Sequence, residues 1–495
     1  MVVKACDRCR SSKEKCAVAT DNPACTRCIR LKLPCSILRR NKRVSRRLSP
    51  KTPVGETQVA VSSIKSVASV NQNSPTVSSR RSVSSISTPP MHRTEASSTP
   101  ISTGPVVIAP EKLLASTLNL QTTSDALRTV LDVEQFSVIH LPFMLGSSFI
   151  PESQKTVYAI LCLSAPTLTE GYLAFLGLMT SYQRSLVMRR GEPDMCKAAM
   201  GLQRLRSVKI SHDYDAACAL FLGQTMYVFN VLTAPYSNTA HSIVRSALMS
   251  TKKWVPRLLQ FPIMDTITMS PILIDTVECL VHREIPIIRL HPQRRVIVDR
   301  YAGLCATLLP HLYDICECSH ALKRNVFEAG SESHSAIYDR LGNIEEAIRY
   351  WRPKTPTQIF ENYGQHAVLA MVTQANVYRL AALLLIHRLR HPLGVENAGA
   401  QKLANNIFAE LAFFAKSSIK DTTALPVVFP LTMAMLEIKG PGEDLLERLA
   451  SFSVQSTSAS RLQEFVQLVR SSRESGFEGT LFDLVESHLH VAMPP

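Results

Sequence analysis

The stretches CDRCRSSKEKC (6–16) and CTRCIRLKLPC (25–35) decide how the first part of this chain can fold. Both follow the spacing C-x2-C-x6-C, so one half-unit is repeated once, with eight residues between the copies. No aromatic residue precedes Phe136, and about thirty residues without one bury too little apolar surface to fold unaided. A bound metal can supply the missing folding free energy, roughly 10 kcal/mol or more in small zinc modules.

Zinc is the metal that these cysteines favour, because it prefers four thiolates in a tetrahedron. Six cysteines can give each of two zinc ions four thiolate ligands if two of the thiolates bridge both metals. The alternatives are a disulfide knot and a ribbon with a single zinc ion. Met1–Ala5 leads to the cysteines without an apolar run, so we expect no signal peptide and a reducing compartment, where clustered cysteines bind metal. The candidate ligands are Cys6, Cys9, Cys16, Cys25, Cys28 and Cys35.

Positive charge gathers in the same part of the chain. The 495 residues carry a formal net charge of +15, and residues 1–50 hold fourteen Lys or Arg against three Asp or Glu. Two Zn²⁺ and six thiolates together contribute −2, so the metal-bound head keeps about +9 and favours an anionic partner such as nucleic acid. The basic run RRNKRVSRR (39–47) is typical of nuclear import or of further phosphate contact.

The cysteine spacing, the run C-R-x-x-K-x-K-C at Cys9–Cys16 and a proline two places before the fourth cysteine, Pro23, resemble the fungal zinc binuclear cluster (Zn2Cys6) family of transcription factors. The resemblance implies a cofactor of two Zn²⁺, with Cys6 and Cys25 bridging the metals. The other ligands would be Cys9 and Cys16 for one metal, and Cys28 and Cys35 for the second.

The same resemblance implies a nuclear, sequence-specific DNA-binding transcription regulator of the RNA polymerase II type, whose partner is double-stranded DNA with CGG triplets. Lys13, held by the rigid cluster in the major groove, would meet the O6 and N7 acceptors of guanine. Other basic residues of the cluster are expected at phosphates, which hold the protein on the duplex without reading its sequence. These are Arg10, Lys15, Arg27, Arg30 and Lys32.

Composition divides the chain into three segments. Residues 1–50 form the DNA-binding head with its basic tail. In residues 51–110, Ser, Thr and Pro fill 28 of 60 positions, which predicts a disordered linker because so few apolar side chains cannot offset chain entropy. Residues 111–495 read as an all-helical domain of roughly fifteen helices, because Val/Ile/Thr alternation and hairpin turns are rare there, and the resemblance implies that this is the family's regulatory domain.

Three stretches carry the helical prediction. Residues 167–190 open with Thr167 and Glu170 at capping-box spacing and close on two arginines. Residues 270–286 place Ser270 as N-cap, Pro271 at the first helical position and Pro286 as the stop. Residues 372–392 are apolar all round in the middle, which indicates a helix buried on every side.

Catalytic motifs are missing from residues 111–495, which hold no phosphate-binding glycine loop, G-x-S-x-G or H-E-x-x-H. We therefore expect no enzyme; the alternative is an enzyme or scaffold that the zinc head tethers to DNA. HLYDICECSH (311–320) gathers Cys and His, but cysteines two apart on a helix point to different faces, so buried side chains without a metal are expected.

Partners of the helical domain follow from the resemblance alone: a coactivator or corepressor, and a small-molecule effector. Apolar runs such as AALLLI (381–386) are far shorter than the ~20 residues that span a bilayer, so no membrane is expected.

Leu113, Leu120 and Leu127 are spaced by seven, but polar residues between them favour a core helix over a coiled coil, which leaves dimerisation open. In ESGFEGTLFDLVESH (474–488), acidic and apolar residues alternate; a terminal amphipathic helix is favoured over an activating segment.

Overall fold

The computed structural model describes residues 125–184, 192–234, 239–325, 333–417, 425–450, 456–489, 493 and 495. These residues belong to one compact unit. They form seventeen α-helices, α4 to α20, and the described ranges contain no strand, only a single β-bridge between Asp299 and Gly303. The expected all-helical architecture is confirmed for them. The zinc head and the linker lie outside the described residues.

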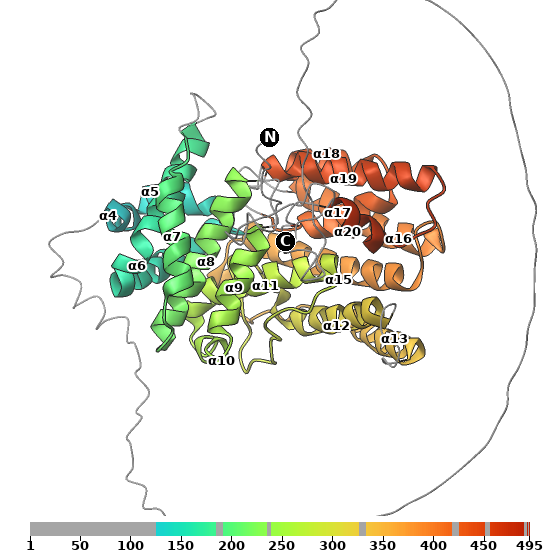
Figure 1. Ribbon diagram of the computed structural model, residues 1–495, viewed down its shortest axis with the longest axis horizontal. Coiled ribbons are helices and arrows are strands. Elements are labelled where there is room, and N and C mark those ends of the chain that lie inside the picture. The colour runs from blue at the N-terminus through green and yellow to red at the C-terminus, as the bar shows by residue number, and fades with distance from the viewer. Residues whose placement is uncertain are drawn as a thin grey trace, which may run out of the picture. The chain divides into compact units, whose positions relative to one another are not determined.

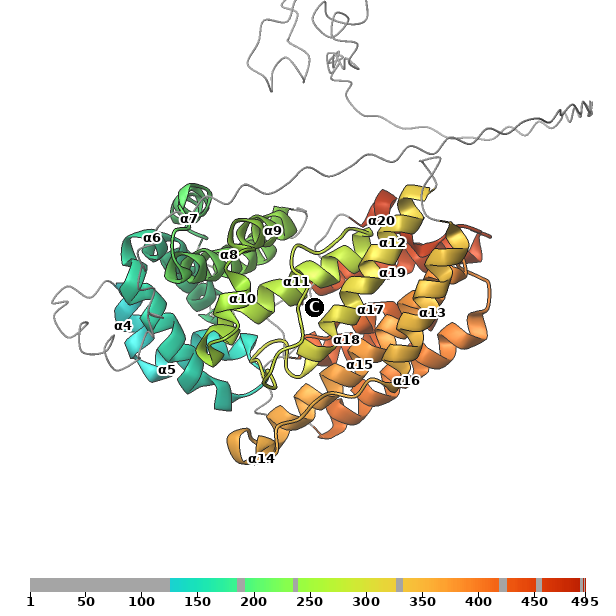
Figure 2. The same ribbon diagram turned by 90° about the horizontal axis from the view of Figure 1, so that it is seen from below.

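The helices fall into two groups on either side of α11, as both views show (Figures 1 and 2). The elements up to α11 are α4 (Asp125–Leu131), α5 (Val133–His140), η1 (Leu141–Phe143), η2 (Ser147–Phe149), α6 (Ile150–Arg184), α7 (Met195–Ser207), α8 (Asp213–Thr233), α9 (Thr239–Thr251), α10 (Val255–Leu258), η3 (Pro262–Met264) and α11 (Asp265–His282).

The second group packs on the other side of α11. Its elements are η4 (Cys305–Thr307), α12 (Leu309–Asn325), α13 (His334–Tyr350), α14 (Ile359–Asn362), α15 (Gln365–Arg390), α16 (Asn397–Ser417), α17 (Val428–Glu437), α18 (Pro441–Ala450), α19 (Ser456–Glu474) and α20 (Leu481–His488).

Helix α11 runs through the core of the unit. Every residue from Asp265 to Val281 is buried, because α8 and α9 cover it from one group and α12 and α20 from the other. Its three carboxylates are all paired. Asp265 bonds Arg295 with oxygen–nitrogen distances of 2.5 and 2.6 Å, Asp275 bonds side chains of α9, and Glu278 accepts the backbone N–H of Met493 at 2.8 Å.

The predicted start of α11 is wrong. The helix begins at Asp265, five residues before the predicted cap Ser270, and ends at His282, where Arg283 takes a left-handed conformation (φ 57°). Pro271 therefore lies inside the helix, where it has no N–H to donate to the carbonyl of Ile267. The side chain of Gln224 on α8 fills that place, since its Nε2 donates to Ile267 O at 2.5 Å.

We expect Gln224→Met to lower the free energy of unfolding by about 1–3 kcal/mol, because it leaves the buried carbonyl of Ile267 without a donor. In a Pro271→Ala background the backbone N–H of residue 271 can make the helical bond, so the same substitution should cost less there. Urea unfolding of the four chains measures this coupling. Equal costs in both backgrounds would mean that Gln224 does not compensate for the proline.

The helix predicted for 167–190 also begins earlier. It is the second part of α6, which breaks at Ser164 (φ −144°, ψ 39°), so Thr167 lies inside the helix rather than at its cap. Pro166, two residues after the break, has no backbone N–H and so cannot donate to the carbonyl four residues before it. The predicted end of this helix, beyond Arg184, lies outside the described residues.

Helix α15 confirms the prediction for 372–392, with buried residues on every side. By length and composition, α8 and α15 could each cross a membrane, which the short apolar runs in the sequence did not indicate. In both helices 78% of the apolar window is buried within the protein, which is the environment of a core helix.

The C-terminal segment 474–488 packs on the domain through an amphipathic helix, which confirms the favoured prediction for it. Leu481, Phe482 and Leu484 of α20 are buried, whereas the carboxylates of Glu478, Asp483 and Glu486 lie on the exposed side. Leu127, the last of the heptad-spaced leucines, is likewise buried in the core, while Leu113 and Leu120 lie outside the described residues.

Candidate functional site

The sequence-predicted zinc and DNA site lies outside the described residues. This applies to its six candidate ligands, Cys6, Cys9, Cys16, Cys25, Cys28 and Cys35, and to its candidate DNA contacts, Arg10, Lys13, Lys15, Arg27, Arg30 and Lys32. The donor set itself fits zinc, because six thiolates with two bridging fill two tetrahedral sites. These assignments therefore remain predictions from the sequence.

The cysteine–histidine run of α12 forms no site. Cys316 and Cys318 are both fully buried, and the Cys316 thiol lies 3.8 Å from the backbone oxygen of Thr276. His320 bonds the backbone oxygen of Arg283 through Nδ1 at 3.0 Å. Burial raises the pKa of the Cys316 thiol, which disfavours the thiolate that a metal needs. The expectation of buried side chains is confirmed for the two cysteines.

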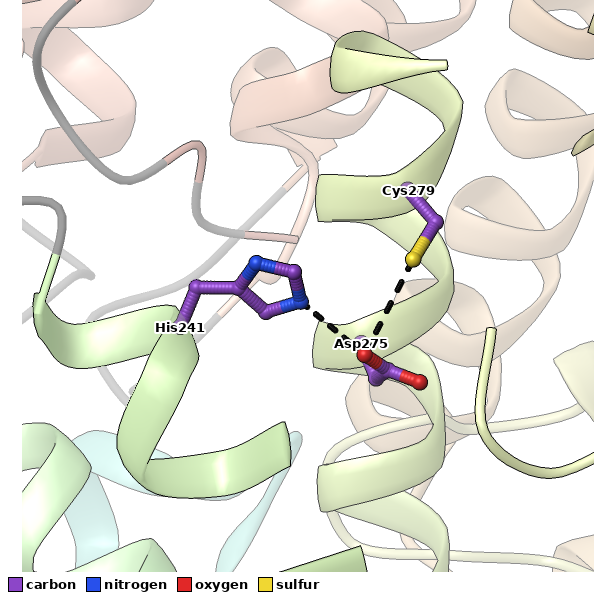
Figure 3. Close-up of side chains that lie close together, drawn as sticks. All are labelled: His241, Asp275 and Cys279. Carbon is purple, nitrogen blue, oxygen red and sulfur yellow. Dashed lines mark hydrogen bonds and ion pairs between the residues drawn. The ribbon is translucent and has the colours of Figure 1, made fainter. Parts of the chain in front are cut away.

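One group of potential metal ligands does come together, and it joins α9 to α11. His241, Asp275 and Cys279 face one another across the two helices (Figure 3), with their ligand atoms within 4.8 Å of each other. His241 Nε2 lies 2.9 Å from Asp275 Oδ1. Sequence analysis missed the group, because only Asp275 and Cys279, four apart on a helix, are close in sequence.

A guanidinium group already occupies the place that a cation would take in this group. Arg245 Nη1 lies 3.1 Å from the Cys279 sulfur and 3.3 Å from Asp275 Oδ1. The second oxygen of Asp275 accepts the backbone N–H of Ile287 at 2.7 Å. A metal ion would have to displace Arg245 and bring two positive charges together, so the arrangement is a hydrogen-bonded cluster that fixes the turn after α11.

The electrostatics of the cluster agree with that structural role. Burial opposes the charge of His241, but its hydrogen bond to Asp275 and the nearby carboxylates outweigh this and raise its pKa. Burial raises the pKa of the Cys279 thiol, with Asp275 adding to the effect. Both shifts work against metal binding, because zinc binds the neutral imidazole and the thiolate.

Comparison with known families supplies what the described residues do not. The model of the fungal Zn(2)-Cys(6) binuclear cluster domain matches residues 4–44, and that of the fungal specific transcription factor domain matches residues 252–474. No curated protein and no solved structure gives a significant match. The chain thus carries a zinc-binding, DNA-binding head and a helical region that matches a fungal transcription factor domain, and neither family is an enzyme family.

Proposed function

We propose that this fungal transcription regulator reads CGG-type sites in the major groove of DNA and acts on RNA polymerase II promoters in the nucleus. The observation that carries the proposal is the C-x2-C-x6-C spacing, repeated once within the matched residues 4–44. In this assignment Cys6 and Cys25 bridge two Zn²⁺, and each metal has two further thiolates, from the half-unit of Cys9 and Cys16 or from that of Cys28 and Cys35.

Rigid ligation explains why metal and charge share one short segment. Each zinc fixes the chain around it, so Lys13 is presented to the groove in one orientation, where it can bond O6 and N7 of guanine. Arg10, Lys15 and the basic residues of the second half-unit hold phosphates and set the register on the duplex. The expected affinity therefore contains a large salt-dependent contribution from counterion release.

The test compares one base-reading residue with one phosphate-binding residue. Lys13→Ala should cost about 1–3 kcal/mol on a duplex with CGG triplets and much less on a scrambled duplex. Arg40→Ala, in the basic run 39–47, should weaken binding to both duplexes alike and flatten the salt dependence. Binding isotherms of the full chain at several salt concentrations measure both effects. Equal losses on both duplexes for Lys13→Ala would place it on phosphate and remove the proposed readout.

The helical region, in this proposal, connects the DNA-bound head to the transcription machinery through a coactivator or corepressor, and responds to a small-molecule effector. What supports this is the match of residues 252–474 to a transcription factor domain. Loss of reporter output on deletion of residues 1–50 would agree with the proposal. Turnover of a small molecule by the purified chain would instead favour an enzyme tethered by the zinc head.

A further inference from the structure

A cavity lies where α6, α8 and α11 meet the chain at residues 300 and 301. Its volume is about 60 Å³, and it is partly open to solvent. At roughly 10–15 Å³ for each water, this is room for about four to six non-hydrogen atoms. Its walls are largely aromatic and apolar, with Phe143, Phe175 and Phe221 among them, and they also carry Arg300, Tyr227 and Ser270.

Arg300 is the only cation of the cavity lining, and it is half-buried. Its Nη1 donates to the backbone oxygen of Phe143 at 3.1 Å, and its Nη2 to Gln224 Oε1 at 3.3 Å. Both acceptors are neutral, and no carboxylate among the described residues forms an ion pair with this guanidinium. A guanidinium has five donors, so several remain for a ligand.

The neighbouring acid, Asp299, makes no ion pair with this guanidinium, although its charge acts on Arg300. Its Oδ1 accepts the backbone N–H groups of Tyr301 and Ala302, at 2.9 and 2.6 Å. Burial raises the pKa of the Asp299 carboxyl and lowers that of Arg300, while the attraction between the two groups opposes both shifts. A partly buried guanidinium that has unused donors and makes no ion pair favours binding of an anion.

Two further polar groups at the cavity have no partner. The Tyr227 hydroxyl and the Ser270 hydroxyl belong to residues that are 1% and 4% exposed, and neither makes a hydrogen bond within the described part of the chain. Buried hydroxyls are rarely left without a bond, because the loss costs about 1–3 kcal/mol each. Each hydroxyl oxygen is almost wholly inaccessible to solvent, so both groups are buried in the cavity wall without a partner and do not face a ligand in the cavity.

His140 completes the wall as a neutral group. Its Nε2 lies 2.7 Å from the Tyr172 hydroxyl, and burial, with a contribution from the charge of Arg300, lowers its pKa to about 3. The cavity therefore presents one positive charge and an apolar surface. Those features match one carboxylate attached to a short apolar chain.

We propose that this cavity binds a small organic carboxylate of about four to six non-hydrogen atoms, with its oxygens on Arg300 and its apolar part against Phe143, Phe175 and Phe221. The ligand would join α8, α11 and the segment that follows α11. Binding of this ligand does not depend on the DNA head. Only the further idea that the ligand regulates transcription as an effector rests on the proposed function.

The binding test uses the full chain and three probes: butyrate, 1-butanol and inorganic phosphate. Saturation-transfer NMR detects the weak binding expected of so small a ligand, and titration gives its dissociation constant. Butyrate should bind, whereas 1-butanol lacks the charge and phosphate lacks the apolar part. Absence of butyrate binding, or binding of 1-butanol or phosphate as tight as that of butyrate, would overturn the proposal.

Two substitutions locate the binding. Arg300→Met should weaken butyrate at least about tenfold, because it removes a charge-assisted hydrogen bond. Arg294→Met, at an exposed arginine of the same segment, lowers the net charge equally and should leave butyrate binding unchanged. Ser270→Val keeps Arg300 and fills the cavity, so it should also weaken butyrate even if Arg300→Met fails to fold. Native affinity in Ser270→Val or in a folded Arg300→Met chain would overturn the assignment.

The DNA head gives an independent control. Lys13→Ala should leave butyrate binding unchanged while it relaxes selectivity for CGG. A chain that binds butyrate but does not discriminate CGG would remove the proposed function and keep the cavity ligand. The reverse result would remove the ligand and keep the function.

Discussion

A Cys6→Ala chain should fail to retain two zinc ions and should lose specific DNA binding. In the proposed ligation Cys6 bridges both metals, so its loss removes one of four thiolates from each site at once. The metal supplies most of the folding free energy of the head, about 10 kcal/mol or more in small zinc modules, so incomplete sites leave the head without a stable fold. Zinc per chain, measured by atomic absorption on the purified full chain after dialysis, gives the result.

Cys9→Ala is the matched control, because in the proposed ligation Cys9 serves one metal only. It should leave one site with four thiolates, and its zinc content should therefore fall less than that of Cys6→Ala. Cys25→Ala, at the second bridging position, should behave as Cys6→Ala does. Retention of two zinc ions by Cys6→Ala would contradict the binuclear assignment, and equal losses in all three chains would contradict the assignment of the bridges.

Arg388→Met should lower the free energy of unfolding by about 3–5 kcal/mol, the usual cost of breaking a buried ion pair by removing one partner. The Arg388 side chain is fully buried in α15, and Nε and Nη2 bond the two oxygens of Glu437 on α17 at 2.7 and 2.6 Å. Three more acceptors saturate the guanidinium. They are the backbone oxygens of Pro392 and Val395 and the side-chain oxygen of Asn397.

Arg390→Met is the control for this prediction. Arg390 lies two residues further along the same helix and pairs with Glu345, but both side chains are partly exposed. Such pairs contribute about 0–1 kcal/mol, so the same substitution should cost little there. Circular dichroism during urea unfolding measures both. Similar costs for the two variants would show that the buried pair is no more important than a surface one.

A double variant separates the charge from the packing. Arg388→Met with Glu437→Leu removes both charges, and well-packed apolar replacements of a buried pair are often neutral. We expect the double variant to recover much of the stability that Arg388→Met loses. Arg473 Nη1 lies 3.3 Å from Glu437 and would remain without that partner, which limits the recovery.

The sequence predicts which residues of the helical region are core more reliably than where helices begin. The apolar middle of α15 and the leucines of α20 were both recognised, because burial follows from local pattern. The start of α11 was misplaced, because Pro271 resembles a first helical residue until Gln224, nearly fifty residues earlier in the chain, is seen to bond Ile267. Compensation of that kind depends on tertiary contacts and leaves no local signal.

The candidate sites divide in the same way. The zinc ligands remain a prediction from the sequence, which can name candidates because their spacing is local and the metal allows few arrangements. The cavity around Arg300 could not, since His140, Tyr227 and Ser270 come from three different helices and none belongs to a motif. Nothing in the sequence around Arg245 indicates its position beside Asp275 and Cys279. That position matters, because the guanidinium takes the place of a metal ion in the group shown in Figure 3.

Burial of α11 from both sides bears on how this protein can be dissected. The transcription factor match begins at residue 252, yet α8 and α9, which cover one side of α11, end before it. The match ends at residue 474, yet α20, which packs on the other side of α11, and Met493, whose backbone N–H bonds Glu278, come after it. A fragment limited to the matched residues would expose to solvent a helix, α11, that is buried in the full unit together with its carboxylates Asp265, Asp275 and Glu278. The cooperative folding unit is therefore longer than the recognisable domain at both ends, and soluble fragments for crystallisation should extend from before α8 through Met493.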